Sequence, residues 1–119
     1  PLERALAPVA VACALPLIRR GFRVTPENAA RSLARVEEVF RVVGERLADG
    51  REWLVGSTFG AVDLTFASLA TPMLLPERFG GTLPRLEEVP ATVGATVLRF
   101  RELPAGRFAL RAYARLRAR

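Results

Sequence analysis

One stretch of the chain constrains the fold more than any other. Between Gly60 and Leu75 the only ionisable side chain is that of Asp63. The stretch shows helical periodicity, and a helix that is apolar on all sides belongs in the centre of a helical bundle. The start of a buried helix is unfavourable, because its first amides lack partners and water cannot reach them. The stretch therefore predicts a central buried helix whose first turn needs its own hydrogen-bond acceptors.

Asp63 has the right position to be that acceptor. It lies three residues after Gly60, the spacing at which a carboxylate reaches back to the amide of the N-cap residue. Phe59 and Leu64 occupy the two positions of a hydrophobic staple, an apolar contact across a helix start. We interpret Gly60, Asp63, Phe59 and Leu64 as a structural N-capping motif. The competing interpretation, Asp63 as a general base, finds no polar companion nearby in the sequence.

The rest of the chain also predicts helices and no strands. The clearest helix runs from Thr25 to Asp49, with Thr25 as its N-cap and Pro26 at the first helical position. A single apolar stripe follows along this helix, formed by Leu33, Val36, Phe40, Val43 and Leu47. We expect an earlier and more deeply buried helix within residues 2–20, kinked or shortened by its two prolines.

Three further helices complete the expected architecture. The central one should end at Thr71 and Pro72, and the next should span residues 90–102 with Val93, Val97 and Phe100 facing inward. A last helix should begin at Pro104. The expected fold is an all-α bundle of five or six helices that covers residues 1–119 as one domain.

Composition removes most catalytic chemistry. The 119 residues include no histidine and one cysteine, which excludes imidazole catalysis, histidine-bound zinc and intrachain disulfides. All 18 basic residues are arginines, and with 12 acidic residues they give a net charge of +6. Arg107, Arg111 and Arg115 recur at helical spacing near the C-terminus, so an arginine-rich helical binder of nucleic acid is one alternative function. No known recognition motif supports it.

One uncharged segment has to be weighed as a membrane or targeting segment. It runs over residues 5–18 but is short and is interrupted by Pro8 and Pro16, so we expect no membrane association. A signal peptide would place a basic segment before it, whereas Glu3 and Arg4 cancel there. A cytoplasmic protein is the default expectation.

The region around Asp63 resembles a known family. Trp53-Leu54-Val55-Gly56, followed after a short gap by Gly60-Ala61-Val62-Asp63-Leu64, is similar to the motif of the C-terminal helical domain of glutathione S-transferases. In that family the acid belongs to the buried N-capping box of the central helix. The family usually has Ser or Thr at the N-cap, where this chain has Gly60. Glycine at this position weakens the cap by a few tenths of a kcal/mol and leaves the fold intact.

The resemblance implies a function for the complete protein. In the family, glutathione binding and thiolate activation belong mainly to a thioredoxin-like domain that precedes the helical one, and residues 1–119 show no such pattern. We therefore expect the chain alone to be inactive and without a cofactor, whereas its full-length parent would use glutathione. The helical domain would form the pocket wall for a hydrophobic electrophile and support a homodimer or oligomer. An exposed apolar patch should mark where the thioredoxin-like domain meets it.

Candidate substrate contacts also follow from the resemblance. The family turns the first helix toward the pocket, so Ala10, Cys13, Ala14 and Leu17 are candidates, together with Tyr113 as a hydrogen-bond donor in the last helix. A different class of function is a protein interaction module, because helical domains of this type also mediate assembly in translation factors and synthetase complexes. The identity of the preceding domain would distinguish the two.

Overall fold

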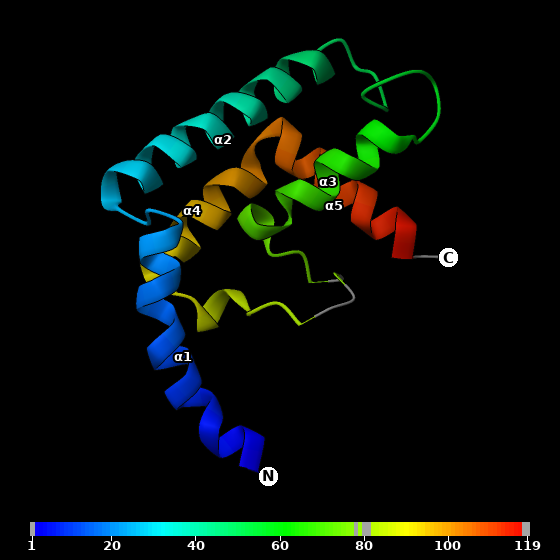
Figure 1. Cartoon of the computed structure of the whole chain (residues 1–119). Coiled ribbons are helices and arrows are strands. Elements are labelled where there is room, and N and C mark those ends of the chain that lie inside the picture. Colours follow the sequence, from blue (N-terminus) through cyan, green and yellow to red (C-terminus); the bar gives the residue numbers. More distant parts are fainter. Residues whose placement is uncertain (1, 78, 80–81, 118–119) are drawn as a thin grey trace. The chain divides into compact units, whose positions relative to one another are not determined.

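The computed structural model describes residues 2–77, 79 and 82–117, apart from the side chains of residues 2–10, 13, 116 and 117. The described residues form five α-helices, one short 3₁₀ helix and no strand (Figure 1). They are α1 (Leu2–Gly21), α2 (Pro26–Leu47), α3 (Ala61–Leu74), η1 (Leu86–Glu88), α4 (Ala91–Glu102) and α5 (Pro104–Arg117). The expectation of an all-α fold with five or six helices is confirmed.

The chain divides into two compact units, residues 1–37 and 38–119, and α2 contributes to both. In the second unit α3, α4 and α5 pack against one another (Figure 1). Phe40 of α2 meets Phe100 of α4 edge-on, with ring centroids 4.7 Å apart. Among the side chains that the structure describes, the buried apolar ones belong to this unit: Phe40, Leu54, Ala67, Ala70, Leu74, Val97, Phe100, Ala105, Phe108, Ala109 and Ala112.

The contact between α4 and η1 explains a wrong expectation about α4. Val97 and Phe100 are buried as expected, but Val93 is 45% exposed. The inward-facing residue of that turn is the buried Gly94, where an added Cβ would lie 3.8 Å from side-chain atoms of Leu86 and Val89. A side chain at residue 93 therefore points away from the contact with η1, because neighbouring positions of a helix differ by about 100° in direction.

The central helix α3 is less buried than its sequence predicted. Its buried residues are Asp63, Ala67, Ala70, Thr71 and Leu74, which lie on the side that packs against α4 and α5. Val62 is 49% exposed, Leu64 47% and Leu69 76%, and helical spacing places Leu64 on the other flank of the helix from Val62 and Leu69. Phe40 of α2 also contacts α3, with ring centroids of Phe40 and Phe66 5.5 Å apart. Within the described residues of the second unit, α3 is therefore not buried all round.

The end of α3 also differs from the prediction. The helix continues past Pro72 to Leu74, because a proline in the last turn removes only one amide donor. Leu75 then adopts the left-handed conformation, with φ 42° and ψ 60°, and its amide donates to the carbonyl of Thr71 at 2.9 Å. Arg101 of α4 holds this end by donating from Nε to the carbonyl of Leu74 and from Nη2 to that of Leu75, both at 2.8 Å.

This end of α3 gives a testable prediction. Arg101→Met should lower the free energy of unfolding by about 1–2 kcal/mol, because two part-buried carbonyls lose their charged donor and a cation is lost from a helix C-terminus. Urea denaturation followed by circular dichroism measures the change. Arg107→Met is the control, because Arg107 is exposed and has only a long 3.6 Å ion pair with Glu102. Equal losses in the two variants would contradict the role of Arg101.

The first unit has no core of its own. Thr25 caps α2, since its Oγ1 accepts a hydrogen bond from the amide of Asn28 at 3.2 Å. The described side chains of α1 are exposed, including Val11 at 59% and Leu17 at 74%. Within this unit the described side chains of the first helix are not buried as expected, because one helix and half of another do not enclose a core. Among the described residues, no helix is both long and apolar enough to cross a membrane.

Candidate functional site

The start of α3 is built around one buried carboxylate. Gly60 is the N-cap, in an extended conformation with φ −134° and ψ −174°. Asp63 is fully buried, and its Oδ2 accepts a hydrogen bond from the amide of Gly60 at 2.8 Å. Its Oδ1 accepts a second one from the amide of Leu54, also at 2.8 Å. The carboxylate thus joins the first turn of α3 to the loop that precedes it.

Leu54 is the point at which this loop is fixed. Its side chain is only 3% exposed, and its amide donates to Asp63. Its carbonyl accepts from Nε of Arg46 in α2 at 2.8 Å and from Nη1 of Arg51 at 3.4 Å. The side-chain hydrogen bond from Arg51 also lowers the pKa of the exposed Asp49 carboxyl to about 2. Both backbone groups of Leu54 are therefore satisfied by side chains from the flanking helices and loop.

Sequence reasoning did not assign Leu54 and Arg46 to this arrangement. Leu54 was noted only as part of the motif around Trp53, and the arginine lies eight residues earlier, in α2. Helical spacing gives no sign that a side chain in one helix will reach a carbonyl in the following loop. The one available signal is the run of three apolar residues Trp53-Leu54-Val55 within this loop.

The two staple positions lie as follows. Phe59 packs edge-on against Trp53, with ring centroids 5.3 Å apart. Leu64 is 47% exposed. Phe59 therefore contacts another residue of the same loop. Together with the hydrogen bonds of Leu54, this contact stabilises the loop that leads into α3.

The missing side chain at the N-cap leads to a second prediction. Gly60 makes no side-chain cap, and a Cβ built there would lie 3.7 Å from Oδ2 of Asp63, an ordinary contact. Gly60→Ser should raise the free energy of unfolding by a few tenths of a kcal/mol, because the new hydroxyl can accept from the amide of Asp63. The same change at Gly50, where φ is +83°, should lower it, because a serine is strained there. Thermal unfolding of both variants tests the pair, and a loss of stability in Gly60→Ser would contradict the cap geometry.

Asp63 is not placed to act on a substrate. Both of its oxygens accept backbone hydrogen bonds, and no part of it is exposed to solvent. A general base must come within hydrogen-bond distance of the proton that it removes. The geometry of Asp63 therefore suits a structural role.

The candidate substrate contacts are divided between the two units. Ala10 and Cys13 lie outside the described side chains. Ala14 and Leu17 are exposed on α1 in the first unit. Tyr113 belongs to α5 in the second unit.

Tyr113 already has a hydrogen-bond partner. Its hydroxyl pairs with Oγ1 of Thr71, a buried residue of α3, and its ring lies 6.3 Å from that of Phe79. Thr71 Oγ1 also lies 3.4 Å from the carbonyl of Ala67, to which it can donate. If Thr71 donates to Ala67, the hydroxyl proton of Tyr113 is used in the bond to Thr71. Tyr113 is then available to a ligand as an acceptor and as an aromatic surface, not as the expected donor.

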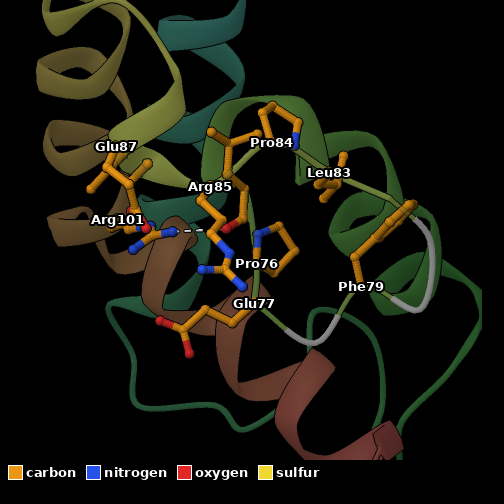
Figure 2. A pocket seen from close by; sticks show the side chains of 10 residues that line it. Pro76, Glu77, Phe79, Leu83, Pro84, Arg85, Glu87 and Arg101 are labelled. Carbon is orange, nitrogen blue, oxygen red and sulfur yellow. Dashed lines mark hydrogen bonds between the residues drawn. The ribbon is translucent and has the colours of Figure 1, made fainter.

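A cavity of about 550 Å³ is lined by residues 75–77, 79 and 83–87 and by Arg101 of α4. Figure 2 shows Pro76, Glu77 and Arg85 near its centre, with Phe79 and Leu83 on one side and Arg101 and Glu87 on the other. A second cavity of about 230 Å³ shares Pro76, Glu77 and Arg101 with it and extends to Tyr113. The lining combines apolar side chains with two cations and two carboxylates.

The cavities hold little of what catalysis needs. The described part of their lining includes no serine, threonine or cysteine, and Arg101 is already bound to two carbonyls. Among the described residues, no group of three or more carboxylate or cysteine side chains is arranged to hold a metal ion. These cavities can accommodate a small molecule, but the described side chains provide no activated nucleophile beside it.

These features define a class: a helical domain whose half-exposed central helix begins at a buried, doubly bonded carboxylate. A family comparison gives this class a name, matching residues 6–94 to the C-terminal domain of glutathione S-transferases. The chain belongs to this family. The comparison with curated proteins gives no match, and neither does the comparison with solved structures.

Proposed function

We propose that this chain is the C-terminal helical half of a glutathione S-transferase-like protein and packs against a thioredoxin-like domain encoded before it. The observation that carries the proposal is the exposed face of α3. Val62 and Leu69 on one flank of this face and Leu64 on the other leave apolar side chains in solvent, and the only ionisable side chain of α3, that of Asp63, is buried. An exposed helix face without charges and with several apolar side chains is typical of an interface between domains or proteins.

In this proposal the thioredoxin-like domain supplies the glutathione site and the chemistry. The helical half would supply the wall of the pocket for a hydrophobic electrophile, with Ala10, Cys13, Ala14 and Leu17 as its candidate residues and Tyr113 as an aromatic contact. The division of labour is supported by the bonding of Asp63 and Tyr113, whose polar atoms are engaged within the protein. The chain alone would then have no transferase activity. Its cytoplasmic location stays a prediction from the sequence.

Glutathione-affinity retention tests the proposal. The full-length protein, expressed with its preceding coding sequence, should bind immobilised glutathione and elute with free glutathione. The 119-residue chain should pass through the same column unretained. Two results would contradict the proposed transferase-like function: a preceding domain that is not thioredoxin-like, or a full-length protein that does not bind glutathione. A different preceding domain would instead favour the interaction module.

The uncovered face of α3 also leads to a prediction about the isolated chain. We expect it to self-associate, because two copies that pair through this face remove its apolar side chains from water when the partner domain is absent. Leu69→Glu should shift it toward monomer, since a buried charge would be placed in that contact. Leu98→Glu, at a 50% exposed position of α4, is the matched control and should leave the association unchanged. Sedimentation velocity measures this, and a wild-type chain that is monomeric at all concentrations would contradict the prediction.

The arginine-rich nucleic-acid binder finds little support in the second unit. Residues 38–119 contain twelve arginines and nine carboxylates, an excess of only three positive charges. Two of the arginines in the α5 stripe face carboxylates, since Arg107 pairs with Glu102 and Arg115 pairs with Glu52. Nucleic-acid binding needs an uncompensated positive surface. We therefore favour the transferase-like role.

A further inference from the structure

The C-terminal helix α5 lies outside the residues that the family comparison matches, yet it contacts the loop that leads into α3. The match covers residues 6–94, and α5 spans Pro104–Arg117. Near the end of α5, Arg115 forms an ion pair with Glu52. Its guanidinium carbon also lies 5.2 Å from the centroid of the Trp53 ring. One side chain of α5 thus contacts two consecutive residues of the loop.

These two residues directly precede Leu54, whose amide is bound by Asp63. The ring of Trp53 also contacts two other aromatic rings: that of Phe108 in α5, with centroids 6.3 Å apart, and that of Phe59, with centroids 5.3 Å apart. The contacts form a continuous path from the end of α5, through the loop, to the first turn of α3. Arg115 is its most exposed member, with a side chain 63% exposed to solvent.

We propose that Arg115 acts as a latch: it holds the loop of residues 52–59 on α5 and thereby keeps the amide of Leu54 on the carboxylate of Asp63. Arg115 is a positioning residue in this scheme, because it touches neither Leu54 nor Asp63 and acts through Glu52 and Trp53. The ion pair and the cation–π contact are both accessible to solvent, so an anion that competes for Arg115 would release the loop. This inference does not depend on the proposed transferase function.

Arg111 provides a matched control within the same helix. It lies one turn before Arg115 and lines the same small cavity of about 80 Å³ beside Trp53 and Phe108. Among the described residues, no ion pair or hydrogen bond involving Arg111 is found. Arg111→Ala and Arg115→Ala therefore remove the same charge from the same helix, but only the second removes an ion pair with Glu52 and a cation–π contact with Trp53.

Amide hydrogen exchange followed by NMR tests the latch in the 119-residue chain. In Arg115→Ala, we expect the amide of Leu54 to exchange about fivefold faster, the size of effect that one exposed ion pair and one cation–π contact provide. The amide of Ala67, in the buried middle of α3, serves as an internal reference for global unfolding and should keep its rate. Fluorescence of Trp53, the only tryptophan, should shift to longer wavelength. Arg115→Lys should restore part of the protection of Leu54.

Three results would overturn the proposal. The first is an unchanged exchange rate of Leu54 in Arg115→Ala. The second is an equal acceleration of Leu54 and Ala67, which would show a loss of overall stability and no local release. The third is an effect of Arg111→Ala as large as that of Arg115→Ala, which would assign the change to the charge of α5 and not to the contact with the loop.

Discussion

Replacement of Asp63 by alanine should lower the free energy of unfolding by about 3 kcal/mol, because two backbone amides lose their only acceptor. The amide of Leu54 lies in a residue that is 3% exposed, so water does not readily take the place of the carboxylate. The substitution therefore releases two parts of the chain together: Leu54, whose carbonyl accepts from Arg46, and the first turn of α3. Equilibrium unfolding in urea, followed by circular dichroism, gives the change directly.

A matched substitution separates this effect from the general loss of an acidic residue. Asp49→Ala removes a carboxylate that is bound to Arg51 in an exposed ion pair, so its midpoint of unfolding should stay close to that of the wild type. The unfolding midpoint of Asp63→Asn should fall between those of the two alanine variants. The asparagine has one side-chain oxygen, which can replace one of the two carboxylate oxygens that accept from Leu54 and Gly60. If Asp63→Ala unfolds at the same urea concentration as Asp49→Ala, the buried carboxylate does not support the start of α3.

Replacement of Gly106 by alanine should be at least as damaging, with a loss of about 3 kcal/mol or failure to fold. A Cβ at this position would lie 2.0 Å from the carbonyl oxygen of Phe100 and 3.2 Å from Cα of Arg101. Both of these are backbone atoms of α4, so no side chain can rotate to make room. The clash is relieved only if α5 moves away from α4, which separates Phe108 from the core. Thermal unfolding and the yield of soluble protein measure the effect.

Gly94→Ala is the control for that experiment. Gly94 is also buried and helical, but the nearest atoms to a Cβ there are 3.8 Å away, on Leu86 and Val89. The substitution should be neutral or raise stability by about 0.5–1 kcal/mol, because alanine favours the helix over glycine. A Gly106→Ala variant that unfolds at the same temperature as Gly94→Ala would show that the close contact of α4 and α5 is absent in solution.

The local features of the helices could be predicted because they depend on neighbouring residues. The N-cap of α2 at Thr25, the start of α4 after Pro90 and the start of α5 at Pro104 all follow from residues within one turn of the helix end. The same holds for the hydrogen bond between Asp63 and Gly60, whose partners are three residues apart. Prolines inside helices were less informative: α3 continues past Pro72 to Leu74, and α1 spans Leu2–Gly21 and is not shortened by Pro8 or Pro16.

Expectations about burial were less successful, because burial depends on what an element packs against. Val93 was expected to face inward, but the contact with η1 selects Gly94. The apolar composition of α1 and α3 predicts burial, whereas Leu17 within the first unit and Leu69 within the second are largely exposed. Composition measures how apolar a surface is, and it does not say whether another element of the same chain covers that surface.

The sequence by itself determined that this chain is helical, where most of its helices begin and end, and that one carboxylate belongs at the start of the central helix. Only the tertiary structure decided that the second oxygen of Asp63 binds Leu54, that Arg46, Arg101 and Arg115 hold loop and helix ends from other helices, and that Gly106 admits no side chain. The physical reason is distance along the chain. Caps and periodicity act between residues within about a turn of one another, whereas these contacts join residues that only packing brings together.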